Sequence, residues 1–121
     1  MPEYDLRKRT KAFALRIINL YSALPKTAEA QVIGKQTLRS GTSVGANYRE
    51  AYRARSDAEF IAKMGDCLRE LDETAYWLEL IMEANILPEN KVTSLHEETE
   101  QLIAIFTTII KKKKQNTFHN S

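Results

Sequence analysis

Side chains that carry enzymatic chemistry are sparse in this sequence of 121 residues. The histidines are His96 and His119, and His96 is followed by glutamates at positions 97, 98 and 100. A histidine beside carboxylates suggests a metal site, but metal sites in helical bundles use Glu-x-x-His pairs on facing helices. The sequence contains no such pair. It therefore predicts no metal site and no cofactor.

Other candidates for catalysis are equally weak. Glu70 and Glu73 lie three residues apart, but a catalytic dyad would need a pocket and a substrate. The simpler interpretation is that one carboxylate is bonded internally and the other is solvated or ion-paired. Cys67 is the single cysteine, which excludes an intrachain disulfide and predicts an inert buried thiol at an apolar helix position. No glycine-rich phosphate loop or nucleophile motif occurs. We expect a protein that is not an enzyme.

Basic residues offer a different chemistry. Arg49, Arg53 and Arg55 lie close in sequence to Tyr48 and Tyr52, a combination that suits phosphate contact and base stacking. A second basic set is the run of Lys111, Lys112, Lys113 and Lys114. The alternative is that the arginines are solvated, the tyrosines pack against neighbouring helices and the lysines end a helix.

Charge is unevenly distributed along the chain, although the net charge is only +2. Residues 1–25 hold five basic and two acidic residues, and residues 26–55 hold six and two. Residues 56–85 hold two and eight, and residues 86–121 hold five and four. A basic first half and an acidic third quarter favour either binding of a polyanion or docking between subunits.

All of these residues are expected to lie on or next to helices, because the hydrophobic residues recur with helical spacing and no alternating strand pattern occurs. Pro25 and Asn85 predict helix ends, and Thr27 and Ser56 predict N-caps. The predicted helices span residues 4–24, 28–54, 57–84 and 89–113. Short connections make neighbours antiparallel, so the prediction is an all-α, up-down-up-down four-helix bundle. It forms one domain over residues 1–114, followed by a flexible tail at 115–121.

Two features of the predicted helices are unusual. Gly41 and Gly45 lie on one face of the second helix, where they would permit close approach of another helix. The third helix carries apolar residues around more of its circumference than one small bundle can cover, which predicts self-association. These residues are Phe60, Ile61, Leu68, Tyr76, Trp77 and Ile81.

The stretch from Gln36 to Ala51 contains the pattern Q-x-x-R-S-x-x-S-x-x-x-N-x-x-E. Together with the block from Glu70 to Leu78, it resembles the four-helix-bundle proteins called 23S rRNA intervening-sequence proteins, over about residues 5–112. That resemblance implies a homopentameric ring and a proposed affinity for RNA. A related bundle, the accessory variability protein of diversity-generating retroelements, binds nucleic acid and a reverse transcriptase through a basic surface.

The resemblance also implies a role for a set of polar residues on the second and third helices. They would form a hydrogen-bonded network that fixes the register between helices or subunits, and a ligand site is the alternative. The set is Gln36, Arg39, Ser40, Ser43, Asn47, Glu50, Glu70, Glu73 and Thr74.

The leading hypothesis is a homo-oligomeric, pentameric bundle that binds RNA, with Arg49, Arg53, Arg55 and the lysines at 111–114 contacting phosphates. The alternative is a scaffold that binds an unidentified protein partner and has no affinity for nucleic acid. No apolar run is long enough to cross a bilayer, and residues 1–13 lack the apolar stretch of a signal peptide. We therefore expect a cytoplasmic protein with no membrane contact.

Overall fold

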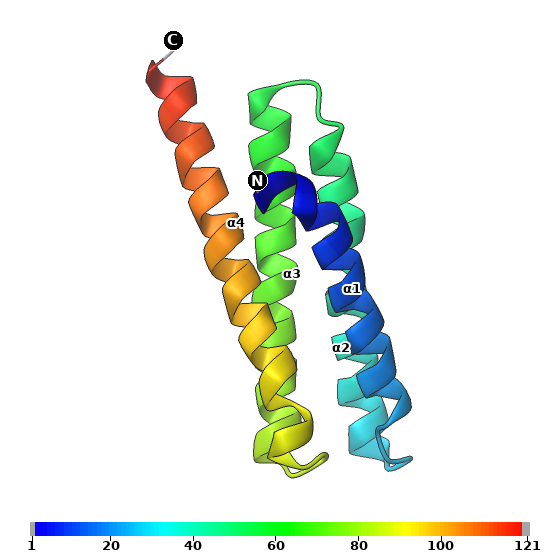
Figure 1. The fold of residues 1–121 in the computed structure, drawn as a ribbon. Helices are drawn as coiled ribbons and strands as arrows, with labels where there is room; N and C mark the ends of the chain where they lie inside the picture. Colours follow the sequence, from blue (N-terminus) through cyan, green and yellow to red (C-terminus); the bar gives the residue numbers. More distant parts are fainter. Residues whose placement is uncertain (1, 120–121) are drawn as a thin grey trace.

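Four long α-helices account for most of the chain in the computed structural model, which describes residues 2–119, with side chains described for residues 6–117. Successive helices pack side by side in antiparallel order (Figure 1). This confirms the predicted all-α, up-down-up-down bundle. The elements are α1 (Pro2–Ser22), α2 (Ala28–Tyr52), α3 (Asp57–Glu83), the short 3-10 helix η1 (Glu89–Lys91) and α4 (Thr93–His119).

The predicted start and stop signals act as the sequence suggests. The side chains of Thr27 and Ser56 accept hydrogen bonds from the backbone N–H groups of Ala30 and Glu59, which caps α2 and α3. Asn85 has φ 57°, the left-handed conformation that commonly ends a helix. These capping residues lie within a few residues of the preceding or following helix, so the connections between helices are short.

The apolar stripes of the four helices meet in one core. Leu6, Phe13 and Ile17 of α1 are fully buried, as are Met64 and the other core residues of α3. Many of the buried residues of α2 are small, and at Gly41 the helix lies directly against α1. A Cβ added there would come within 2.7–2.9 Å of three carbon atoms of Ile17. The predicted close approach at this glycine is confirmed.

The boundaries of the last helix differ from the prediction. The segment predicted to begin a helix at 89 instead forms η1, and α4 starts at Thr93. At the other end, helical backbone continues through residue 119, where the sequence predicted a tail from 115. Thr117 Oγ1 donates to Asp57 Oδ2 over 3.1 Å, and Lys113 lies over the ring of Phe60. The last turns of α4, which lack an apolar stripe, therefore contact α3 through a hydrogen bond and a cation–π contact. Residues 120 and 121 of the predicted tail lie outside the described residues.

Helices α1 and α4 meet at few points. Arg9 of α1 forms a two-pronged contact with Glu98, with N–O distances of 2.8 and 2.9 Å, and Arg16 donates to Ser94 over 2.9 Å. In Figure 1 the C-terminal half of α4 leans away from α1. Within residues 2–119, no helix is both long enough and apolar enough to cross a membrane.

Candidate nucleic-acid interface

The three arginines predicted to contact phosphates lie at one end of the bundle. Arg49 and Arg53 are one turn apart near the end of α2, and Arg55 lies in the connection to α3. All three are exposed, and none forms an ion pair with a carboxylate of the described residues. The backbone N–H of Arg55 donates to Glu59 Oε1 over 3.2 Å, which fixes the connection but leaves the guanidinium in solvent.

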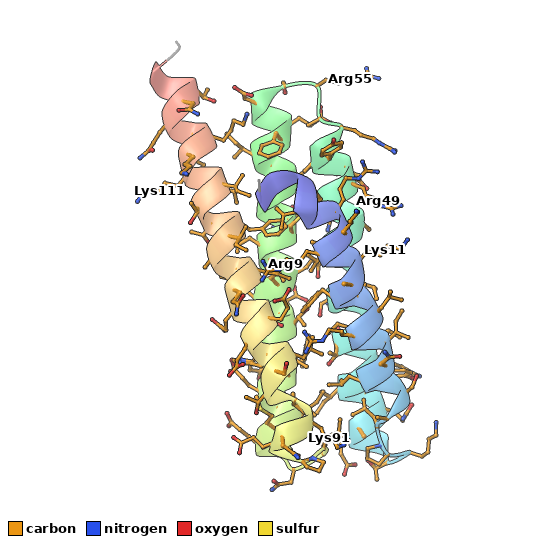
Figure 2. All side chains as sticks on the ribbon, viewed as in Figure 1. Arg9, Lys11, Arg49, Arg55, Lys91 and Lys111 are labelled. Carbon is orange, nitrogen blue, oxygen red and sulfur yellow. The ribbon has the colours of Figure 1, made fainter. Side chains whose placement is uncertain are left out.

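Arg49 faces basic residues that the sequence prediction missed. A shallow groove of about 360 Å³ runs between α1 and α2 and has three cationic side chains on its walls, Arg7, Lys11 and Arg49. Figure 2 shows Lys11 and Arg49 near each other on this side of the bundle. The remaining lining residues are small or uncharged: Thr10, Ala14, Thr42, Gly45 and Ala46. Both threonine hydroxyls donate to carbonyls of their own helices.

This groove, defined here as the α1–α2 basic groove, carries uncompensated positive charge. No carboxylate lines it, and none of the described residues forms an ion pair with its three cations. The guanidinium of Arg7 lies 4.9 Å from the centre of the Tyr52 ring, a cation–π contact that holds Arg7 beside the end of α2. Because small side chains form the floor, a ligand can approach the helix backbones closely.

The two tyrosines beside the arginines have different environments. Tyr48 is 3 % exposed and packs edge-on against Phe106, with ring centres 5.9 Å apart, so it is a core residue with no face for a base. Tyr52 is 53 % exposed, and the contact with Arg7 covers one part of its ring. Of the two, Tyr52 retains aromatic surface near the basic groove.

The lysine run does not join the arginines in one surface. Lys111, at the start of the run on α4, and Arg49 project on opposite sides of the bundle in Figure 2. Lys113 turns toward α3, where its Nζ lies 3.6 Å from Asp57 Oδ1 and 5.2 Å from the centre of the Phe60 ring. Lys111, Lys112 and Lys114 are exposed. The two predicted phosphate-binding sets are therefore separate surfaces.

The polar set on α2 and α3 forms several links between these helices. Arg39 contacts both Glu70 and Glu73, and these carboxylates raise its pKa, with the hydrogen bond to Glu73 as the largest cause. Gln36 Oε1 accepts a weak hydrogen bond from Arg39 Nε over 3.4 Å. Further along α2, Glu50 pairs with Lys63 over 2.6 Å. The ion pairs of Arg39 and Glu50 thus join α2 to α3, whereas the bond between Gln36 and Arg39 lies within α2.

Burial within the polar set is limited to one pair. Ser40 and Thr74 are fully buried, and their hydroxyl oxygens lie 2.8 Å apart. Ser43 is half-buried and donates to the Arg39 carbonyl of its own helix. Asn47 is half-buried and has no hydrogen bond from its side chain to the described residues. A register-fixing role for the set stays a prediction.

Comparison with known proteins places these features in a family. The family description "23S rRNA-intervening sequence protein" matches residues 3–108, nearly the whole bundle. The chain belongs to this family. It is also similar to a crystal structure from Bacteroides thetaiotaomicron, described as a protein with unknown function from the S23 ribosomal protein family. The two share 39% sequence identity and a TM-score of 0.85, over 92% of this chain and 99% of the other. No curated protein matches this sequence.

Arg7 and Lys11 carried only a weak signal in the sequence. The first 25 residues are basic, but the pattern gives no indication of which cations face α2. The packing of α1 against Gly41 and Gly45 of α2, where an added Cβ would lie 2.7 Å from Ile17 and 3.3 Å from the Thr10 hydroxyl oxygen, sets the register that places Lys11 and Arg49 in one groove.

Proposed function

We propose that this chain is a non-enzymatic, homo-oligomeric bundle that assembles as a pentamer and binds RNA, including rRNA, through the α1–α2 basic groove and the adjoining arginines. One observation carries the proposal. Arg7, Lys11 and Arg49 line a common groove without a carboxylate among its lining residues. Arg53 lies one turn beyond Arg49, and the two arginines also line a second hollow with Glu50, Glu59 and Lys63.

The charge arrangement supports a polyanionic ligand. Some other cations of the described surface, among them Arg9, Arg39 and Lys63, are paired with carboxylates, whereas the three groove cations are not. Cations without such partners attract phosphates and release counterions on binding, which makes affinity steeply dependent on salt. Arginine also matches phosphate geometry through paired N–H groups. Repetition of the groove around a pentamer would strengthen weak individual contacts.

A second candidate is a protein-interaction scaffold without affinity for nucleic acid. Several large apolar side chains at the surface favour it, among them Leu15, Val32 and Tyr76, which are 54%, 64% and 54% exposed. Such residues are often covered by a partner. Self-association alone would account for them in the leading proposal, so the affinity for RNA separates the two candidates.

The deciding experiment is fluorescence anisotropy with a labelled, structured rRNA fragment at several salt concentrations. Two variants each lose three positive charges. Arg7→Ala/Lys11→Ala/Arg49→Ala removes the groove cations, and the matched control Lys111→Ala/Lys112→Ala/Lys114→Ala removes exposed lysines of α4. We expect the groove variant to bind RNA at least about tenfold more weakly. The slope of log affinity against log salt concentration should fall by roughly two to three, because fewer counterions are released on binding.

The lysine control should bind nearly as the parent chain does. An equal loss in both variants would mean that net charge alone drives binding and would remove the groove from the proposal. Absence of binding by the parent chain at about 150 mM salt would replace the RNA proposal with the scaffold.

A further inference from the structure

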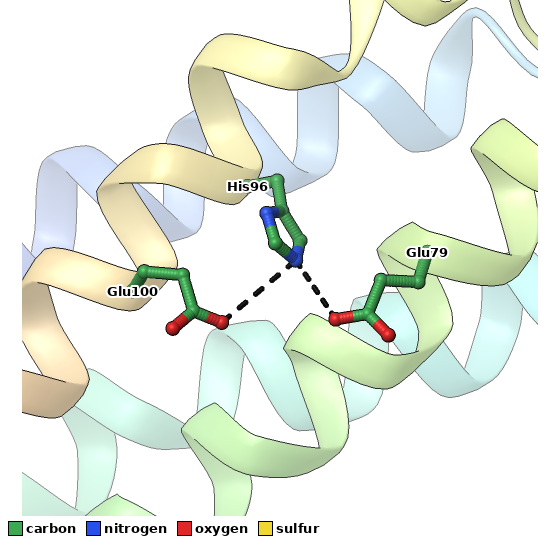
Figure 3. A group of neighbouring side chains, drawn as sticks. All are labelled: Glu79, His96 and Glu100. Atoms are coloured by element: carbon green, nitrogen blue, oxygen red, sulfur yellow. Dashed lines mark hydrogen bonds and ion pairs between the residues drawn. The ribbon is translucent and has the colours of Figure 1, made fainter.

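Three potential metal ligands converge where α3 meets the first half of α4 (Figure 3). His96 Nε2 lies 2.9 Å from Glu79 Oε2 and 3.8 Å from Glu100 Oε2. His96 and Glu100 share a face of α4 because they are four residues apart, and Glu79 reaches across from α3. The three ligand atoms all lie within 4.8 Å of one another.

These distances are close to those of a zinc site. Zinc bound tetrahedrally at about 2.0–2.2 Å from nitrogen and oxygen ligands holds those atoms roughly 3.3 Å apart. The two distances from the imidazole nitrogen lie on either side of that value. The side chains of Glu79 and Glu100 are 44% and 55% exposed, whereas that of His96 is 22% exposed. Rotation of the two freer carboxylates would therefore complete the geometry without displacement of either helix.

The local charge also favours a cation. No lysine or arginine of the described residues pairs with Glu79 or Glu100, and both carboxylates turn to the same imidazole nitrogen. If that nitrogen carries a hydrogen, the N–H can form a well-aligned hydrogen bond with only one of the two carboxylates. A divalent ion would accept the nitrogen lone pair and neutralise both carboxylates at once.

We propose that Glu79, His96 and Glu100 bind a first-row divalent transition metal, with Zn²⁺ as the preferred probe. Imidazole nitrogen with carboxylate oxygen suits this class of ion, whereas Mg²⁺ and Ca²⁺ prefer oxygen alone. The remaining coordination position is open to solvent. Because the ligands come from two helices, the bound ion links α3 to α4 and stabilises the folded chain. This site is separate from the basic groove and does not depend on RNA binding.

The test is calorimetric titration of the EDTA-treated full chain with Zn²⁺, together with thermal melts with and without the ion. We expect one ion per chain and a higher melting temperature with Zn²⁺. Glu79→Gln and His96→Gln should each weaken binding by at least about tenfold. The control Glu97→Gln alters an exposed carboxylate beside the site, and His119→Gln removes the other histidine. Both controls should bind as the parent chain does.

A spectroscopic measurement covers the case in which a variant loses its fold. Co²⁺ should give intense visible absorption bands of a four-coordinate site with the parent chain, and these should disappear in Glu100→Gln, whose exposed side chain can change without cost to the core. The proposal fails if no saturable Zn²⁺ binding occurs, or if His96→Gln binds as tightly as the parent. The three residues would then form only an ion-paired link between helices.

Discussion

Ser40 and Thr74 illustrate how individual polar side chains are accommodated in the core. Thr74 Oγ1 donates to the Glu70 carbonyl of its own helix over 2.8 Å. Its single hydrogen is thereby used, so the 2.8 Å contact with Ser40 requires the Ser40 hydroxyl to donate to Thr74. Both buried hydroxyls are satisfied, which removes the free-energy cost of an unpaired polar group.

Cys67 is predicted to be chemically inert in the folded protein. Its side chain is fully buried, its thiol points to the Val44 carbonyl, and burial raises the pKa of the thiol from 9.0 to about 12. The thiolate is the reactive form, so at pH 8 the raised pKa alone lowers its population roughly a thousandfold. We expect iodoacetamide to label the native chain very slowly and the urea-unfolded chain readily, as followed by mass spectrometry.

The same shift predicts a dependence of stability on pH. Because the folded pKa lies above the unfolded value, the contribution of this thiol to stability is fully present below about pH 9 and declines toward pH 12. Cys67→Ala is the control, because its unfolding free energy should lack this component. Equally rapid labelling of native and unfolded chains would contradict a buried, protonated thiol.

At the scale of the helices, the α1–α2 contact depends on the absence of side chains from α2. Gly41→Ala would push a methyl group to within 2.7–2.9 Å of Ile17, which is fully buried and cannot move away freely. We expect a loss of about 1–3 kcal/mol of unfolding free energy, measured by urea denaturation. The intrinsic preference of helices for alanine over glycine, up to about 1 kcal/mol, offsets part of a larger steric cost.

Gly65 provides the matched control for that substitution. It lies inside α3, and a Cβ added there meets no atom within 4 Å. Gly65→Ala should therefore raise the unfolding free energy by about 0.5–1 kcal/mol through helix preference alone. Equal effects of the two substitutions, in either direction, would show that the contact of Gly41 with Ile17 does not limit helix packing.

Local signals predicted the elements well because their causes are local. Thr27, Ser56 and Asn85 act through hydrogen bonds and dihedral angles within a few residues, so their positions could be inferred from the sequence. The neighbours of Arg49 and His96 could not be inferred in this way. Lys11 and Glu79 reach them only through the register of one helix on another, which side-chain packing sets. What the sequence does not provide is the position of one helix along another, which decides which side chains become neighbours.

At the scale of the whole molecule, exposed apolar residues predict assembly. Leu15 and Ile18 are 54% and 42% exposed and lie one turn apart on α1. Light scattering should give about five times the chain mass of 13.9 kDa for the proposed pentamer. Leu15→Glu/Ile18→Glu should reduce the assembly to single chains, because a charge buried at an interface without a partner is costly.

Asn90→Glu is the control for that variant, because it adds a charge at an exposed position at the end of the bundle. Circular dichroism should show the same helix content for both variants. A pentamer that persists in the double variant would place the contact elsewhere. A parent chain that is monomeric at micromolar concentration would refute the proposed assembly itself.

The few contacts between α1 and α4 have a consequence for how the chain folds and opens. Most tertiary contacts join helices that are consecutive in the chain, so the loops that must close during folding are short. Chains dominated by such local contacts fold rapidly. The contact between α2 and α3 is the most extensive of all the helix pairs, and Arg9 and Arg16 of α1 add polar contacts with α4. Separation of α1 from α4 would break these polar contacts and expose the interior, while the contact between α2 and α3 still holds the rest of the bundle together.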